Sequence, residues 1–151
     1  MTRRVLILNG PNLNRLGRRE PEIYGTTTLA EIEAMCRAVE AELAIDFRQT
    51  NSETQLIEWI HAAIDGEPPA DGIIINPAAY TFTSLALLDA LKMFDGPIIE
   101  LHLSNVHRRE ALYHHSLVSK TATAVMMGFG ALGYPTAVRA MAALLESRKP
   151  S

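Results

Sequence analysis

Hydrophobic and polar positions follow two periods along the chain, and their alternation predicts five strands separated by helices. Short apolar runs without helical spacing are typical of strands buried on both faces. Longer segments with apolar residues three and four positions apart are typical of amphipathic helices. We predict strands over residues 5–8, 45–50, 72–76, 98–101 and 122–127. We predict helices over residues 28–44, 52–65, 85–94, 107–115 and 135–147, with capping boxes at the start of the first two.

The regular alternation of strands and helices predicts an α/β fold. It favours a flavodoxin-like open sheet of five parallel strands in the order 2-1-3-4-5, with helices on both faces. Such sheets bind ligands at the carboxyl ends of their strands, near the point where the strand order reverses. Residues 9–14, 76–80 and 100–105 are the most polar segments that follow predicted strands. We therefore expect the functional residues at this edge of the sheet.

Length and composition place the chain among ordinary globular domains. Its 151 residues are 48% hydrophobic and 21% charged, which predicts a single domain over residues 1–151. A net charge of −3 without a basic run argues against nucleic-acid binding. The only cysteine, Cys36, excludes a disulfide framework and a cysteine-based zinc site. The apolar run after the basic start is too short for a signal peptide, and residues 122–138 contain glycines and a proline, so we expect no membrane span and a cytoplasmic location.

The loop after the first strand, residues 9–25, is long for a compact domain, and loops of this length are usually functional or disordered. Its turn residues and apolar positions favour an ordered loop. The loop places Arg19 five residues before Tyr24. A free tyrosine is a poor base near neutral pH because its pKa is about 10, but a neighbouring guanidinium favours the phenolate. Tyr24 is thus a candidate base. The alternative is that Arg18 and Arg19 are solvated and that Tyr24 packs as a lid residue.

A second candidate group lies at the end of the fourth predicted strand. Glu100 and His102 are two residues apart and therefore point to the same side of an extended chain. A carboxylate beside an imidazole raises its proton affinity and fixes its orientation, as a general acid requires. The alternative is a histidine satisfied by a backbone carbonyl. A metal site formed by Glu100, His102 and His107 is a further alternative, against which stands the absence of another clustered carboxylate or cysteine in the sequence to complete a shell.

Neutral hydrogen-bond donors accompany the candidate base and the candidate acid. Asn12 and Asn76 offer amides to a carbonyl that becomes an oxyanion, and Ser104 and Asn105 offer backbone N–H groups to a carboxylate. Together with a base and an acid, these groups suit proton abstraction next to a carbonyl with loss of a hydroxyl, a reaction that requires no cofactor. No glycine-rich nucleotide motif is present.

Six motifs are spread along the chain in a fixed order: Leu8-Asn-Gly-Pro-Asn-Leu-Asn, Gly17-x-Arg19-Glu-Pro-x-x-Tyr24-Gly, Gln49-x-Asn51, Asn76-Pro-x-Ala-Tyr-Thr, Glu100-x-His102-x-Ser104-Asn and His114-His-Ser. On these motifs the chain resembles the type II 3-dehydroquinate dehydratases over nearly its whole length. The resemblance implies a flavodoxin-like fold, a dodecamer built as a tetramer of trimers, and no metal or organic cofactor. It also implies the anti elimination of water from 3-dehydroquinate through an enolate, either in aromatic biosynthesis by the shikimate pathway or in a catabolic or specialised pathway.

The resemblance also implies roles for individual residues. Tyr24 would be the base, with Arg19 stabilising its phenolate. His102, beside Glu100, would protonate the departing hydroxyl, and Asn12 would help to hold the enolate through a water. The substrate carboxylate and the ring carbon next to it would be bound by Asn76 with Leu103 and Ser104. Arg109 would lie near the base, and Asp89 would reach the site of a neighbouring subunit.

Two positions depart from the family pattern. The chain has Thr81-Phe82-Thr83 where the family has Thr-His-Thr, and Tyr113 where the family has an arginine. Both family residues are associated with the substrate ring hydroxyls. Their loss predicts a lower kcat/KM for 3-dehydroquinate and leaves an alternative hypothesis, a related dehydratase or hydratase acting on a less hydroxylated cyclic ketone. A non-catalytic binding or assembly protein is a third hypothesis, and a flavodoxin-like electron carrier is a fourth.

Overall fold

Five parallel strands form one sheet in the order β2-β1-β3-β4-β5, as the sequence predicts. The computed structural model describes residues 2–148, so both ends of the predicted domain lie outside the described residues. That residues 1–151 form one domain stays a prediction. β2 lies at one edge of the sheet and β5 at the other. The strands are β1 (Arg3–Asn9), β2 (Leu43–Gln49), β3 (Gly72–Asn76), β4 (Ile98–His102) and β5 (Ala124–Met127).

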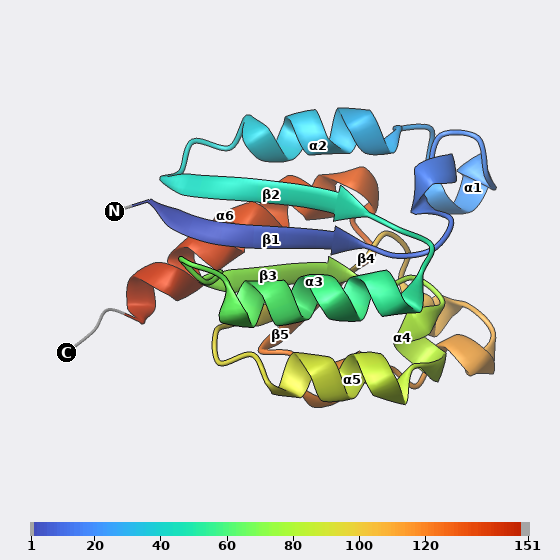
Figure 1. Ribbon diagram of the computed structural model, residues 1–151. Helices are drawn as coiled ribbons and strands as arrows, with labels where there is room; N and C mark the ends of the chain where they lie inside the picture. The colour runs from blue at the N-terminus through green and yellow to red at the C-terminus, as the bar shows by residue number, and fades with distance from the viewer. Residues whose placement is uncertain (1, 149–151) are drawn as a thin grey trace.

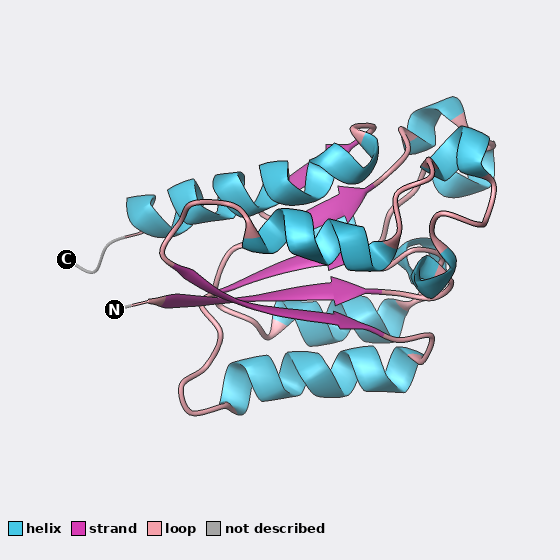
Figure 2. Ribbon diagram, turned by 90° about the horizontal axis from the view of Figure 1, so that it is seen from above, coloured by secondary structure: helices cyan, strands magenta, loops and turns pink. Residues whose placement is uncertain are grey.

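Helices cover both faces of the sheet (Figures 1 and 2). α2 and α6 pack on one face, and α3 and α5 on the other. The alternating side chains of β1 supply both cores, because Val5 and Ile7 face α2 and α6 while Leu6 and Leu8 face α3 and α5. No helix within residues 2–148 is long and apolar enough to cross a membrane. The helices are α1 (Pro21–Tyr24), α2 (Leu29–Arg37), α3 (Glu53–Asp65), α4 (Tyr80–Thr83), α5 (Leu85–Lys92) and α6 (Gly133–Ser147).

Side-chain caps set the starts of three helices. Thr28 and Glu31 form the predicted reciprocal capping box at α2. At the start of α3 only half of the predicted capping box forms, because Ser52 accepts from the Gln55 amide while its own amide donates to the Thr50 hydroxyl. The Ser84 hydroxyl caps α5 by accepting from the Leu87 amide.

The predicted extension of the first long helix to residue 44 is wrong, because α2 ends at Arg37. Leu43 continues the helical spacing of apolar residues, but it opens β2 and pairs with Arg3 of β1. Sheet pairing therefore overrides the local pattern.

The predicted helix over residues 107–115 is also wrong. This segment forms two short 3₁₀ turns, η2 (Val106–Arg108) and η3 (Ala111–Tyr113). Between them Arg109 and Glu110 are extended, with ψ of −175° and 153°. Contacts of Arg109 across the molecule, described below, explain this break.

The ends of β1 and β3 approach each other closely at the edge where the strands point. The Gly10 amide donates a hydrogen bond of 2.8 Å to the carbonyl of Asn76. A Cβ at Gly10 would lie 2.4 Å from the carbonyl oxygen of Pro77, so only glycine fits at this position. This contact brings the loops that follow the two strands together.

Candidate active site

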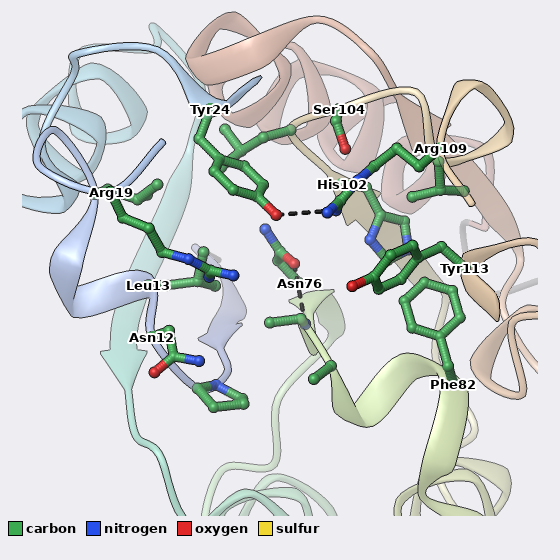
Figure 3. A pocket seen from close by; sticks show the side chains of 16 residues that line it. Asn12, Leu13, Arg19, Tyr24, Asn76, Phe82, His102, Ser104, Arg109 and Tyr113 are labelled. Carbon is green, nitrogen blue, oxygen red and sulfur yellow. Dashed lines mark hydrogen bonds between the residues drawn. The ribbon is translucent and has the colours of Figure 1, made fainter. Parts of the chain in front are cut away.

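A pocket opens at the carboxyl ends of β1, β3 and β4 (Figure 3). Ten of the twelve residues predicted for the site line it. Glu100 does not line it and lies behind His102, fully buried. Asp89 is exposed on α5, outside the pocket, and its contribution to a neighbouring subunit stays a prediction. The predicted residues in the lining are Asn12, Arg19, Tyr24, Asn76, Phe82, His102, Leu103, Ser104, Arg109 and Tyr113.

Two guanidinium groups approach Tyr24. Nη1 of Arg109 donates a hydrogen bond of 2.9 Å to the Tyr24 hydroxyl, drawn as a dashed line in Figure 3. Arg19 lies over the tyrosine ring, with Cζ 5.1 Å from its centroid, and its Nε is 3.3 Å from a carboxylate oxygen of Glu20. Two positive charges thus lie against the side chain of the candidate base. Arg109, which is 85 residues away in sequence, makes the direct contact with the hydroxyl.

Glu100 holds His102 from behind the pocket. The Nε2 atom of His102 lies 2.5 Å from Oε2 of Glu100, which leaves Nδ1 as the ring nitrogen free of this bond. The hydroxyls of Ser116 and Ser119 also donate to the Glu100 carboxylate, at 2.9 and 2.5 Å. Burial raises the pKa of the Glu100 carboxyl, but the hydrogen bonds from His102 and the two serines outweigh it and leave that pKa below its ordinary value. Glu100 is therefore an ionised residue that orients the imidazole.

Neither serine has a role that the sequence predicts. Ser116 lies in the His114-His-Ser motif, which could have indicated it, whereas Ser119 lies in no recognised pattern.

Asn76 is held by a buried network that the sequence did not reveal. Its Nδ2 donates to the hydroxyl of Tyr134 at 3.1 Å, and that hydroxyl donates to Oδ1 of Asn9 at 2.6 Å. Oδ1 of Asn76 accepts from the amide of Ala78, whose φ of +52° turns the chain sharply. A primary amide has two N–H donors, so one N–H of Asn76 remains for a ligand.

A polar cluster supports the start of the long loop. The amide of Asn12 donates to Oδ1 of Asn51 at 3.0 Å, and Asn12 itself adopts φ of +71°. Gln49 donates to the carbonyl of Gly10 and to the side chain of Asn51. These contacts explain why the loop is ordered and why Asn12 reaches the pocket.

Aromatic side chains form the wall opposite Arg19 and Asn12 (Figure 3). The ring of Tyr113 meets that of Phe82 edge-on, with 5.4 Å between centroids. Phe82 in turn lies roughly parallel to the ring of His102, with 6.2 Å between centroids. The two departures from the family pattern are thus neighbours in the site.

The charge of the pocket suits a small anion. Arg19 and Arg109 line it, and none of the described lining residues carries a carboxylate. Ser104 lies in the lining, whereas Asn105 uses its side chain to accept a hydrogen bond from the His107 amide. Within residues 2–148 no three histidine, cysteine or acidic side chains are arranged to hold a metal ion.

Comparisons with known proteins agree with this arrangement. The sequence profile of the family described as Dehydroquinase class II matches residues 3–142. The chain belongs to this family. A curated 3-dehydroquinate dehydratase of Methylobacterium radiotolerans is 56% identical over 146 residues, covering 95% of this chain and 96% of that protein. The 3-dehydroquinate dehydratase 2 of Pseudomonas aeruginosa is 54% identical over 149 residues, covering 97% and 99%.

A solved member of the class II dehydroquinase family has the same fold. The crystal structure of type II dehydroquinase from Propionibacterium acnes superposes with a TM-score of 0.84 at 42% identity, covering 95% of this chain and 98% of that one. The flavodoxin-like sheet predicted from the sequence is confirmed.

Proposed function

We propose that this protein is a type II 3-dehydroquinate dehydratase, a hydro-lyase that converts 3-dehydroquinate to 3-dehydroshikimate. The observation that carries the proposal is one pocket in which a base and an acid are each held by a charged partner. Arg109 contacts the Tyr24 hydroxyl, and Glu100 contacts the His102 ring. The family membership and the names of relatives at 54–56% identity support the same activity.

The proposed reaction begins with proton abstraction by Tyr24. Its phenolate takes a proton from the carbon next to the substrate carbonyl, and the electron pair moves onto the carbonyl oxygen as an enolate. The guanidinium groups of Arg109 and Arg19 place two positive charges beside this side chain, one at its hydroxyl and one over its ring. Asn12 lies in the lining and offers an amide donor to the enolate oxygen.

Elimination follows with His102 as the general acid. The enolate pair returns to form the new carbon–carbon double bond, and the C–O bond to the leaving hydroxyl breaks. His102 supplies the proton that turns this hydroxyl into water. The proton now on Tyr24 and the proton missing from His102 balance, so exchange with solvent restores both groups. Each step uses side chains of the protein, and the proposal includes no cofactor or metal.

Substrate binding is proposed to use the other lining residues. Leu103 and Ser104 bind the carboxylate, and the remaining N–H of Asn76 binds the ring end next to it. Phe82 and Tyr113 face the ring hydroxyls in place of the family histidine and arginine. The alternative hypothesis, a different and less hydroxylated ketone, is not favoured by the relatives, which carry the name 3-dehydroquinate dehydratase. A purely binding role would leave the two held titratable residues without a purpose.

The test is the steady-state rate on 3-dehydroquinate, followed by the ultraviolet absorbance of the conjugated product. We expect turnover by the natural chain and a loss of about 10²- to 10⁴-fold in kcat for Tyr24→Phe. Tyr80→Phe is the matched control, because Tyr80 lies outside the pocket lining and its hydroxyl donates to the backbone carbonyl of Asn51. Equal rates for Tyr24→Phe and the natural chain would show that Tyr24 is not the base.

We extend the proposal to the assembly and the pathway. Several large apolar side chains are exposed on the single chain, including Leu85, Leu112, Phe129 and Leu132, and contacts between subunits would cover such residues. Together with the family resemblance they support a dodecamer of four trimers, which analytical ultracentrifugation would detect as twelve times the mass of the chain. Participation in the shikimate pathway follows from the proposed reaction, and a cytoplasmic location stays a prediction.

A further inference from the structure

Arg109 is held from two sides. Its Cζ lies 4.2 Å from the centroid of the Tyr113 ring, close enough for a strong cation–π contact, and 5.6 Å from that of Tyr24. Its Nη1 donates to the Tyr24 hydroxyl at 2.9 Å. Nε2 of His114 lies 2.7 Å from its carbonyl oxygen and fixes the backbone. Four flexible torsions separate that backbone from the guanidinium, so the direction of the guanidinium depends on the rings.

Tyr113 is itself supported. Its ring meets Phe82 edge-on at 5.4 Å, with an angle of 74° between the planes, which is a favourable aromatic geometry. Phe82 lies on α4, whereas Tyr113 and Arg109 follow β4, so contacts between separate segments fix the Tyr113 ring. Figure 3 shows Tyr113 beside Arg109 on the side of the pocket away from Arg19.

We propose that Tyr113 is a positioning residue, whose ring face holds the guanidinium of Arg109 against the hydroxyl of Tyr24. The inference rests on the proposed function, because it assigns Tyr24 as the base. Tyr113 acts through Arg109, and its ring, rather than its hydroxyl, carries the effect. The family arginine at this position is associated with the substrate ring hydroxyls, whereas Tyr113 supports the base.

The experiment compares Tyr113→Leu, which removes the ring, with Tyr113→Phe, which keeps it. A cation–π contact of this kind corresponds to about a 2- to 30-fold effect. We expect Tyr113→Leu to lower kcat by that factor. It should also move the acid limb of the kcat–pH profile to higher pH, because the guanidinium of Arg109 is no longer held at the hydroxyl of Tyr24. Tyr113→Phe should recover most of kcat. Ala111→Ser is the matched control, because Ala111 is on the same turn, is exposed and lies outside the pocket lining.

A second readout does not depend on turnover. The phenolate of Tyr24 absorbs in the near ultraviolet, and for each protein its signal is isolated by subtracting the titration of the same protein with Tyr24→Phe added. We expect Tyr113→Leu, and not Tyr113→Phe, to move the midpoint of this titration to higher pH. If 3-dehydroquinate is not turned over, the proposed function fails while the optical titration still tests the positioning role.

The proposal is overturned if Tyr113→Leu matches the natural chain in the optical titration, or if Tyr113→Phe is impaired as much as Tyr113→Leu. The second outcome would assign the effect to the hydroxyl. Should Tyr113→Leu fail to fold, Tyr113→Gln serves as a second variant without a ring, with the same expected shifts.

Discussion

Replacement of Glu100 by glutamine tests whether a buried charge orients the candidate acid. The carboxylate is fully buried and accepts three hydrogen bonds, from His102, Ser116 and Ser119. A glutamine can keep the bonds from His102 and Ser116 on its carbonyl oxygen, and the Ser119 hydroxyl can rotate to accept from its NH₂ group. The geometry therefore survives while the charge is lost.

The magnitude follows from these contacts. A hydrogen bond to a charged group contributes about 1.5–3 kcal/mol and a neutral one about 0.5–1.5 kcal/mol. Two retained bonds that become neutral thus lower the free energy of unfolding by about 2 kcal/mol. For a chain of this size that corresponds to a fall in Tm of about 4–8 °C. Glu100→Ala, which leaves three donors unpaired, should cost about 3–5 kcal/mol.

The assay is denaturant unfolding between pH 7 and pH 3.5. The protein concentration is kept fixed, because association between chains also affects the apparent stability. Since the folded pKa of Glu100 lies below its ordinary 4.5, its stabilising contribution is complete above pH 4.5. It is lost as the pH falls through the folded value. We therefore expect the difference between the natural chain and Glu100→Gln to be constant near neutrality and to shrink in acid.

Exposed Glu58 on α3 provides the control, since Glu58→Gln removes the same charge from the surface. A Glu100→Gln protein as stable as the natural chain at pH 7, or a difference that does not change down to pH 3.5, would refute the argument that the buried carboxylate is ionised and stabilising.

Two further predictions concern buried groups near the sheet. Tyr134→Phe should lower the free energy of unfolding by about 1–3 kcal/mol, because Asn9 and Asn76 lose a buried partner; it should also raise KM, and unchanged stability in denaturant would count against the network. Burial raises the pKa of the Cys36 thiol to about 12, so the native protein should not react with Ellman's reagent at pH 8 and the unfolded protein should react fully; rapid labelling of the native protein would contradict this burial.

The sheet and the location of the site could be predicted because both depend on local patterns. Strand-length apolar runs at residues 5–8, 72–76 and 98–101 identify the central strands, and parallel connection fixes the edge at which their ends meet. Tyr24, His102 and Asn76 follow from that geometry, since each lies at or just after a strand end or in the loop beyond it. Topology alone brought them into one pocket.

What could not be predicted depends on contacts between distant segments. The pattern over residues 107–115 is helical, but Arg109 is extended because its side chain contacts Tyr24 and its carbonyl contacts His114. Proximity in sequence points to Arg19 as the partner of the base, and only the family resemblance places Arg109 near it, whereas the direct hydrogen bond comes from Arg109. Local spacing contains no information about either contact.

The roles of two single hydroxyl groups could not be predicted either. Tyr134 lies in an apolar helix and Ser119 in a polar turn, and nothing in their local sequence distinguishes them from ordinary residues. Both matter because a buried amide or carboxylate requires a partner. Such hydroxyl partners can be identified only when the three-dimensional positions of the buried amides and carboxylate are known.

The short helix that carries Tyr24 differs in stability from the sheet that supports the rest of the site. Residues 21–23 of α1 are exposed, and the residues on either side, Glu20 and Gly25, have positive φ. The backbone hydrogen bonds of α1 are local, while Tyr24 is tied to the distant segment through Arg109. Segments of this kind open with a smaller free energy than the sheet that supports them. Local unfolding of α1 is therefore enough to remove Tyr24 from the pocket. Mild denaturant should abolish activity while the five strands remain folded. Hydrogen exchange under the same conditions should show unprotected amides over residues 20–25.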